Sequence, residues 1–198
     1  MANGDSDPRS AASGMGSGAP DNSVLPCGKK KVWTDDQKKA IDQALKDQKT
    51  MLEARKAELD RWDEADKKRF KDCFGSDDAA AKDKIKSRVD KMLELNKGYS
   101  ADNFVPGDPP KDTRFAYVYP NDDKKVYLDK AFWNAPAKGT DSKSGVLCHE
   151  MSHFNSVGAT EDHVYGAKNS KALAKADPEK ALTNADNFEY YCEGACGK

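Results

Sequence analysis

The feature that most constrains this chain is the pentapeptide His149-Glu150-Met151-Ser152-His153, an HExxH motif. Two histidines four residues apart face the same side of an α-helix, so both imidazoles can bind one Zn²⁺ at about 2.0–2.1 Å. Glu150 is offset from this pair, where its carboxylate can take a proton from a water on the metal. The motif therefore predicts a helix, which we expect to start at the N-cap offered by residues 139–142 and to run to Gly158.

A catalytic zinc that keeps water in its fourth position needs a third protein ligand. Two familiar positions for that ligand are excluded, because Ala159 stands ten residues after His149 and Leu173 stands where a more distant glutamate is expected. The chain can instead turn back at a glycine after the helix. We therefore expect one zinc ion, held by the two motif histidines and by either Asp162 or His163.

Charge and hydropathy exclude two other classes of protein. The chain has 33 Lys and Arg against 34 Asp and Glu, which is unlike the concentrated basic charge of nucleic-acid-binding proteins. No apolar run approaches the ~20 residues of a membrane-spanning helix. We expect neither a nucleic-acid partner nor a membrane span.

The composition divides the 198 residues into a leader and one domain. Residues 1–28 are rich in Gly, Ser, Ala, Asp and Asn and lack the apolar segment of a signal peptide. We interpret them as a flexible leader, because they bury too little surface to offset the entropy of ordering. Residues 29–198 are expected to form a single domain, with a helical subdomain at 29–100 and a zinc-site subdomain at 101–198.

Hydrophobic periodicity predicts a helical hairpin in the first of these subdomains. After a capping box that begins at Thr34, apolar residues recur every three, four or seven positions, and the apolar content continues to Gly75. This stripe consists of Ile41, Leu45, Leu52, Leu59 and Trp62. A second amphipathic helix is expected from the cap at 76–78 to Gly98.

The second subdomain mixes strands and helices. We expect a loop at 103–110, a β-hairpin from the alternation at 115–119 and 124–128, and helices over 171–196 that are broken near Pro178. The predicted fold is therefore α+β and predominantly helical, with a small β-hairpin or sheet next to the HExxH helix.

Five cysteines suggest an oxidising compartment. Cys148 lies inside the HExxH helix, where a buried thiol is expected. The other four can form two disulfides in three connectivities, and they are Cys27, Cys73, Cys192 and Cys196.

The segment after the motif resembles the aspzincins, the family of deuterolysin and peptidyl-Lys metalloendopeptidase. The resemblance rests on HExxH followed by a Gly-Thr-x-Asp-x-x-Tyr-Gly element, with one departure, Ala159 between Gly158 and Thr160. It is supported by the segments 117–121 (YVYPN), 131–133 (AFW), 139–142 (GTDS) and 184–190 (NADNFEY).

Membership of this family implies a zincin-like metalloprotease with defined site residues. Asp162 would be the third zinc ligand, and Tyr165 would hydrogen-bond the oxyanion of the tetrahedral intermediate. Glu150 would be the general base, and His163 would lie outside the metal's ligands. Chemistry favours the same assignment, because a phenol three residues after Asp162 can point a donor at the developing oxyanion.

An acidic pair near the C-terminus indicates a substrate preference. Asp186 and Glu189 are three residues apart on an expected helix and so share one face. In lysine-specific members of the resembling family, an acidic pair at these positions lines the pocket for the residue after the cut. Residues 139–193 also contain nine acidic residues against five lysines, a field that favours basic substrates. We expect cleavage of proteins or peptides before lysine.

A second hypothesis is a zinc-bound but non-hydrolytic module, toxin-like in character, that recognises a protein partner. Glu150 and Tyr165 argue against it, because a binding module needs neither. The enzyme is expected to act as a monomer, either secreted or delivered as an effector outside the producing cell. An inhibitor or immunity protein is a further expected partner.

Overall fold

The protein is described by a computed structural model over residues 33–196. Helices dominate it, and one small sheet completes it, so the predicted α+β, mainly helical fold class is confirmed. The elements in chain order are α1 (Asp35–Arg61), α2 (Glu64–Phe74), α3 (Ala79–Lys97), a 3-10 turn (Ala101–Asn103), β1 (Phe104–Pro106), β2 (Ala116–Tyr117), β3 (Val126–Leu128), α4 (Lys130–Asn134), α5 (Lys143–Ser152), α6 (Ala167–Ala176), α7 (Pro178–Ala181) and α8 (Ala185–Glu193). The expected leader and Cys27 lie outside the described residues.

The N-terminal part contains three helices, so the prediction of one unbroken helix to Gly75 is wrong. Trp62 adopts the left-handed conformation, with φ of 51°, and ends α1. Asp63 then caps α2 by accepting hydrogen bonds from the amides of Ala65 and Asp66. This reciprocal cap stabilises a new helix start where the apolar stripe alone suggested continuity.

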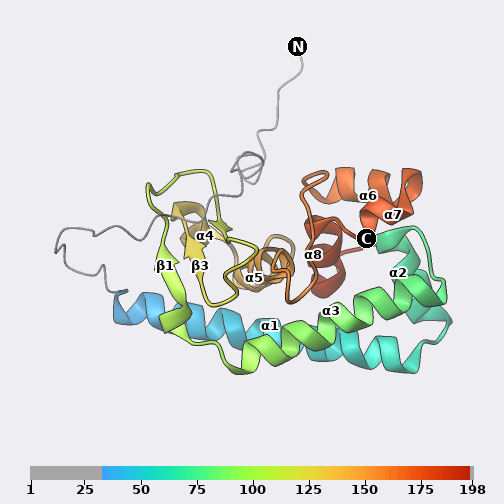
Figure 1. Ribbon diagram of the computed structural model, residues 1–198, viewed down its shortest axis with the longest axis horizontal. Helices are drawn as coiled ribbons and strands as arrows, with labels where there is room; N and C mark the ends of the chain where they lie inside the picture. The colour runs from blue at the N-terminus through green and yellow to red at the C-terminus, as the bar shows by residue number, and fades with distance from the viewer. Residues whose placement is uncertain (1–32, 197–198) are drawn as a thin grey trace, which may run out of the picture.

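The predicted stripe nevertheless forms the contact face of α1. Ile41, Leu52 and Leu59 are fully buried, and Leu45 is nearly so. Figure 1 shows α1 and α3 side by side, with α5 and α8 packed over them, and both α1 and α3 contact α5. The helical part is therefore the base on which the HExxH helix rests.

The three-stranded sheet has the order β1-β3-β2. Strands β2 and β3 are antiparallel, with Tyr117 opposite Tyr127, which is the predicted hairpin. Strand β1 pairs in parallel with β3 inside the segment expected to be a loop, so that expectation is wrong. Pro106 is tolerated there because β1 is an edge strand of the sheet.

Helix α5 carries the HExxH motif and packs mainly against α8. Ser142 caps it by accepting from the amide of Gly145, as predicted, but the helix ends at Ser152 rather than at Gly158. The predicted break near Pro178 is confirmed, since α6 ends at Ala176 and Pro178 opens α7. None of the helices within residues 33–196 combines the length and apolar character needed to cross a membrane.

One disulfide joins α2 to the C-terminal end, between Cys73 and Cys196. Cys148 is a buried thiol, as predicted. Cys192 is also a buried free thiol and a neighbour of Cys148 across the α5–α8 contact, so its predicted disulfide is wrong. Cys192 lies on the interior face of α8. The cysteine that bonds Cys73 is instead Cys196, which lies beyond the C-terminal end of that helix.

Candidate metal centre and active site

Three side chains that could hold a metal ion converge at the C-terminal end of α5. His149 and His153 come from the last turn of that helix and its cap, and Asp162 comes from the loop that follows. Asp162 Oδ1 lies 3.2 Å from His149 Nε2 and 3.5 Å from His153 Nε2. Ligand atoms bound tetrahedrally to one zinc are about 3.4 Å apart, so the spacing fits this ion.

Acceptor oxygens on the far side of each ring indicate that Nδ1 carries a proton in both histidines. His153 Nδ1 lies 2.8 Å from the carbonyl oxygen of Thr160, which can only accept, so Nδ1 carries the proton. His149 Nδ1 lies 2.8 Å from Asp186 Oδ1, and the same argument applies. Both Nε2 atoms therefore face the side of Asp162, which is the arrangement that zinc ligation requires.

The electrostatics of the site also call for a cation. Burial opposes a charge on His149, but hydrogen bonds to Asp162, Asp186 and Glu189 hold the imidazole pKa well above its ordinary value. Burial also works against ionised Asp162, yet the contacts with His149 and His153 lower its pKa to about 2. An ionised Asp162 in the interior, beside two imidazoles, suits a metal ion with charge +2.

Glu150 lies in the same helical turn as the ligands and is 7% exposed. Burial raises the pKa of its carboxyl group to about 7, with a further contribution from the charge of Asp162, while His149 opposes the shift. A carboxyl group with a pKa near neutrality can both accept and deliver a proton.

Tyr165 follows Asp162 by three residues and faces the same site. Its hydroxyl is buried and makes no hydrogen bond of good geometry with any residue from 33 to 196. Burial and the charge of Asp162 raise the pKa of this phenol above its ordinary value, so the proton is retained. The group is a buried donor that is available to a ligand.

The structure does not bring His163 to the other ligands. Its Nε2 lies 2.9 Å from Thr183 Oγ1, and its Nδ1 lies 3.8 Å from Glu161. Between the two candidates that the spacing left open, the donor group includes Asp162 and leaves His163 outside.

Asp186 and Glu189 lie behind His149, on the opposite side of the ring from Asp162. Both are fully buried, with Asp186 Oδ1 at 2.8 Å and Glu189 Oε2 at 3.3 Å from His149 Nδ1. The other oxygen of Asp186 accepts from the amide of Gly166 at 2.6 Å and from the hydroxyl of Tyr190 at 3.4 Å. Carboxylates in this position orient a metal-binding imidazole and raise its basicity.

Sequence reasoning missed two hydroxyl groups that support the ligands. Ser152 Oγ donates to the carbonyl of His149 at 2.6 Å and lies 2.5 Å from Thr160 Oγ1. Ser152 belongs to the HExxH motif and Thr160 to the Gly-Thr-x-Asp-x-x-Tyr-Gly element. Their place in these motifs is the sequence signal that could have identified them.

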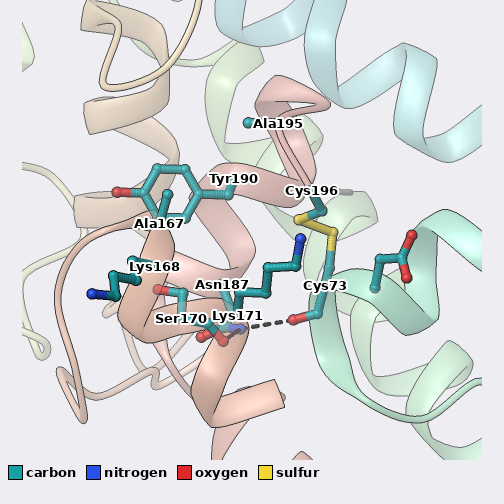
Figure 2. A pocket seen from close by; sticks show the side chains of 10 residues that line it. Cys73, Ala167, Lys168, Ser170, Lys171, Asn187, Tyr190, Ala195 and Cys196 are labelled. Carbon is teal, nitrogen blue, oxygen red and sulfur yellow. Dashed lines mark hydrogen bonds between the residues drawn. A yellow bond between two sulfur atoms is a disulfide. The ribbon is translucent and has the colours of Figure 1, made fainter. Parts of the chain in front are cut away.

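A cavity of about 290 Å³ lies on the other side of Tyr190. Its wall is formed by α6, α8 and the disulfide, as Figure 2 shows, with Ala167, Lys171 and Asn187 among its lining residues. The hydroxyl of Tyr190 reaches Asp186, so this cavity borders the residues that support His149.

The fold and the site together define a zincin-type metallohydrolase centre, with HExxH on a helix and an aspartate from the following loop. Comparison with known proteins narrows this class. The family model for the aspzincins, described as lysine-specific metallo-endopeptidase, matches residues 61–193. The chain belongs to this family, whose members are metalloendopeptidases with a catalytic zinc ion.

Individual relatives agree with that assignment. Over 133 residues the chain is 43% identical to an extracellular protease of Aeromonas hydrophila, covering 66% of this chain and 37% of that protein. Over 79 residues it is 57% identical to a peptidyl-Lys metalloendopeptidase of Grifola frondosa, covering 40% and 23%. The chain thus spans well under half the length of these two relatives.

A solved structure supports the fold directly. The zinc peptidase from Grifola frondosa is similar over 81% of this chain and 96% of that one, with a TM-score of 0.71 and 33% identity. The zincin-like architecture predicted from the motifs is therefore confirmed.

Proposed function

We propose that this chain is a zinc-dependent endopeptidase in which His149, His153 and Asp162 hold the metal. The observation that carries the proposal is the convergence of these three donors, with both Nε2 atoms on the side of Asp162. Two further groups with matching chemistry, Glu150 and Tyr165, lie beside them. Zinc, when bound in such a site, activates a water molecule and polarises the carbonyl group of the scissile bond.

Glu150 is the proton carrier in this proposal. Its carboxylate accepts a proton from the attacking water and returns it to the nitrogen of the leaving amine. A pKa of about 7 suits both steps, because neither protonation state is strongly favoured near neutral pH. Burial of Glu150 also keeps bulk water from competing for that proton.

Tyr165 stabilises the oxyanion. Its hydroxyl is buried beside Asp162 and has no hydrogen bond of good geometry in the described chain, so it can turn to donate to the substrate. A single donor of this kind contributes about 3 kcal/mol to stabilisation of the transition state.

The preferred substrate is a protein or peptide with lysine after the cleaved bond. Asp186 and Glu189 support this, because they are adjacent acidic side chains one hydrogen bond from a metal ligand. Both side chains are fully buried, so they would attract a lysine ammonium group through their negative charge and not through direct hydrogen bonds. The family description and the name of the Grifola frondosa relative point to the same preference.

We further propose that the enzyme acts outside the producing cell, as a monomer. The Aeromonas hydrophila relative is called an extracellular protease, and the disulfide between Cys73 and Cys196 suits an oxidising compartment. We also propose that a protein inhibitor protects the producing cell from this enzyme.

The direct test is Glu150→Gln, which keeps the shape of the side chain and removes the base. We expect zinc content to stay at the wild-type level while kcat on a lysine-containing peptide falls about 10²–10⁴-fold. Glu161→Gln is the matched control, because this carboxylate precedes Asp162 but is 74% exposed. Wild-type activity in Glu150→Gln would refute the mechanism.

Substrate preference is tested on a mixed proteome. Mass spectrometry of the products should find lysine enriched directly after the cut, and a chelator should abolish the cleavage. Products without that enrichment would leave the endopeptidase proposal standing and reject the lysine preference.

A further inference from the structure

The loop that carries Asp162 and Tyr165 is held by a buried side chain that the proposed reaction does not use. Asn184, which is fully buried, accepts hydrogen bonds at Oδ1 from the amide of His163 at 2.9 Å and that of Val164 at 3.2 Å. These two amides lie between the third metal ligand and the oxyanion donor. One side-chain oxygen therefore fixes the backbone that joins the two groups.

Backbone hydrogen bonds fasten the same loop just before Asp162. The amide of Glu161 donates to the carbonyl of Thr183 at 2.8 Å, and the amide of Ala185 donates to the carbonyl of Glu161 at 3.0 Å. Asn184 thus stands at the centre of a short parallel bridge. The loop has no other regular structure between α5 and α6, and outside this bridge it is held near its two ends, where the amide of Thr160 donates to the carbonyl of Ser152 and that of Gly166 to Asp186.

Asn187, one helical turn later, holds Asn184 in place. Its Nδ2 donates to the carbonyls of Cys73 at 2.7 Å and Ser170 at 3.0 Å, and the first of these bonds is drawn in Figure 2. Its Oδ1 accepts from Asn184 Nδ2 at 2.8 Å. Because carbonyl oxygens only accept, Asn187 must present its NH₂ group to them, and this leaves Asn184 only one satisfied orientation.

We propose that Asn184 is a positioning residue of the metal centre, and that Asn187 sets its orientation. The proposal rests on the proposed function, since it assigns Asn184 the task of holding Asp162 and Tyr165 in register with α5. Two amides that lose a buried acceptor must seek other partners, and the loop shifts to provide them. A shift of this kind displaces a ligand and an oxyanion donor together.

The test compares Asn184→Ala, Asn184→Asp and Asn187→Ala with wild type. For Asn184→Ala we expect kcat to fall about 10–100-fold with KM changed less than about threefold, and zinc affinity to fall about 10–100-fold in competition with a chelator. Asn184→Asp keeps an oxygen for both amides, so it should recover about tenfold of the lost kcat. Asn187→Ala should give a smaller loss than Asn184→Ala.

Asn96→Ala is the matched control. Asn96 is also a buried asparagine, and its Nδ2 bonds the carbonyl of Leu45 and the side chain of Gln48, neither of which belongs to the loop or to the three metal donors. It should lower thermal stability and leave kcat and zinc affinity at wild-type values. A purely structural role for Asn184 would make the two alanine variants alike in all three measurements.

A second readout tests the positioning role of Asn184 without relying on peptide cleavage. The visible spectrum of the Co²⁺-substituted protein reports ligand geometry without any substrate, and we expect it to change in Asn184→Ala but not in Asn96→Ala. If wild type cleaves no peptide, the proposed function fails while this spectrum and the zinc affinity still test the positioning role. Wild-type kcat, zinc affinity and spectrum in Asn184→Ala would overturn the proposal, and if that variant does not fold, unchanged kcat, zinc affinity and spectrum in Asn187→Ala would do so.

Discussion

Replacing Asp186 by asparagine removes one negative charge from behind the metal centre and changes little else in size. In the structure, Asp186 receives donors at both oxygens, from His149 Nδ1 at 2.8 Å on one side and from the amide of Gly166 at 2.6 Å on the other. An asparagine has one oxygen and one NH₂ group. Whichever way it turns, one of these donors then faces another donor.

The structure sets the size of the effect. If the NH₂ group faces His149, the imidazole loses its charged acceptor, and only Glu189 at 3.3 Å remains to hold the tautomer. If it faces Gly166, a buried amide loses its partner. Loss of a carboxylate that orients a metal-binding histidine costs about 10–100-fold in affinity, or about 1.4–2.7 kcal/mol.

The assay is a titration of zinc against a chromophoric chelator, with Tm measured with and without the metal. Asp186→Asn should bind zinc 10–100-fold more weakly and gain less Tm from it than wild type. Glu179→Gln, which removes a carboxylate that is 85% exposed, should match wild type. If zinc affinity is unchanged and only cleavage before lysine is impaired, then Asp186 does not orient His149 and our assignment is refuted.

Three more predictions concern stability. Gly158→Ala should cost roughly 1–3 kcal/mol in thermal unfolding, since its Cβ would stand 2.4 Å from Nε of buried Arg88; an unchanged Tm would contradict this close approach. Ala159→Gly should gain roughly 0.5 kcal/mol, because Ala159 has φ of 46°; a loss of stability would count against it. Burial, with the charge of Glu189, raises the pKa of Glu193 from 4.5 to about 8. The folded chain then holds this proton more tightly than the unfolded chain, so Tm should fall between pH 4.5 and 8 more steeply in wild type than in Glu193→Gln, and equal slopes would refute it.

The parts of the fold that could be predicted from sequence are those with a local signal. The cap at Ser142 and the alternation around Tyr117 are read from neighbouring residues, and both predictions are confirmed. The break at Trp62 was missed because a short capping pair at Asp63 outweighs a long apolar stripe. Strand β1 was missed because its hydrogen bonds are with β3, about twenty residues further on, and no local pattern reports such a pairing.

In the site, as in the fold, local patterns could be read from the sequence and long-range contacts could not. The spacing of HExxH places two histidines on one face of a helix, but spacing alone left Asp162 and His163 as equal candidates. What separates them in the structure is the backbone of the loop, which Asn184 holds from outside the motif by accepting from the amide of His163. His163 then reaches Thr183 instead of the other ligands. In our proposal the choice of ligand therefore depends on a contact between residues about twenty positions apart.

Asp186 and Glu189 illustrate what a helical pattern leaves open. Their spacing correctly predicts a shared face of α8, yet it carries no information on what that face meets. The structure directs the face at His149 Nδ1, so the same acidic pair that we propose to attract lysine also supports a metal ligand. A change made to alter substrate preference at Asp186 should therefore also weaken zinc binding. Glu189, at 3.3 Å rather than 2.8 Å, is the position where the two effects are more separable, because Asp186 remains as the acceptor.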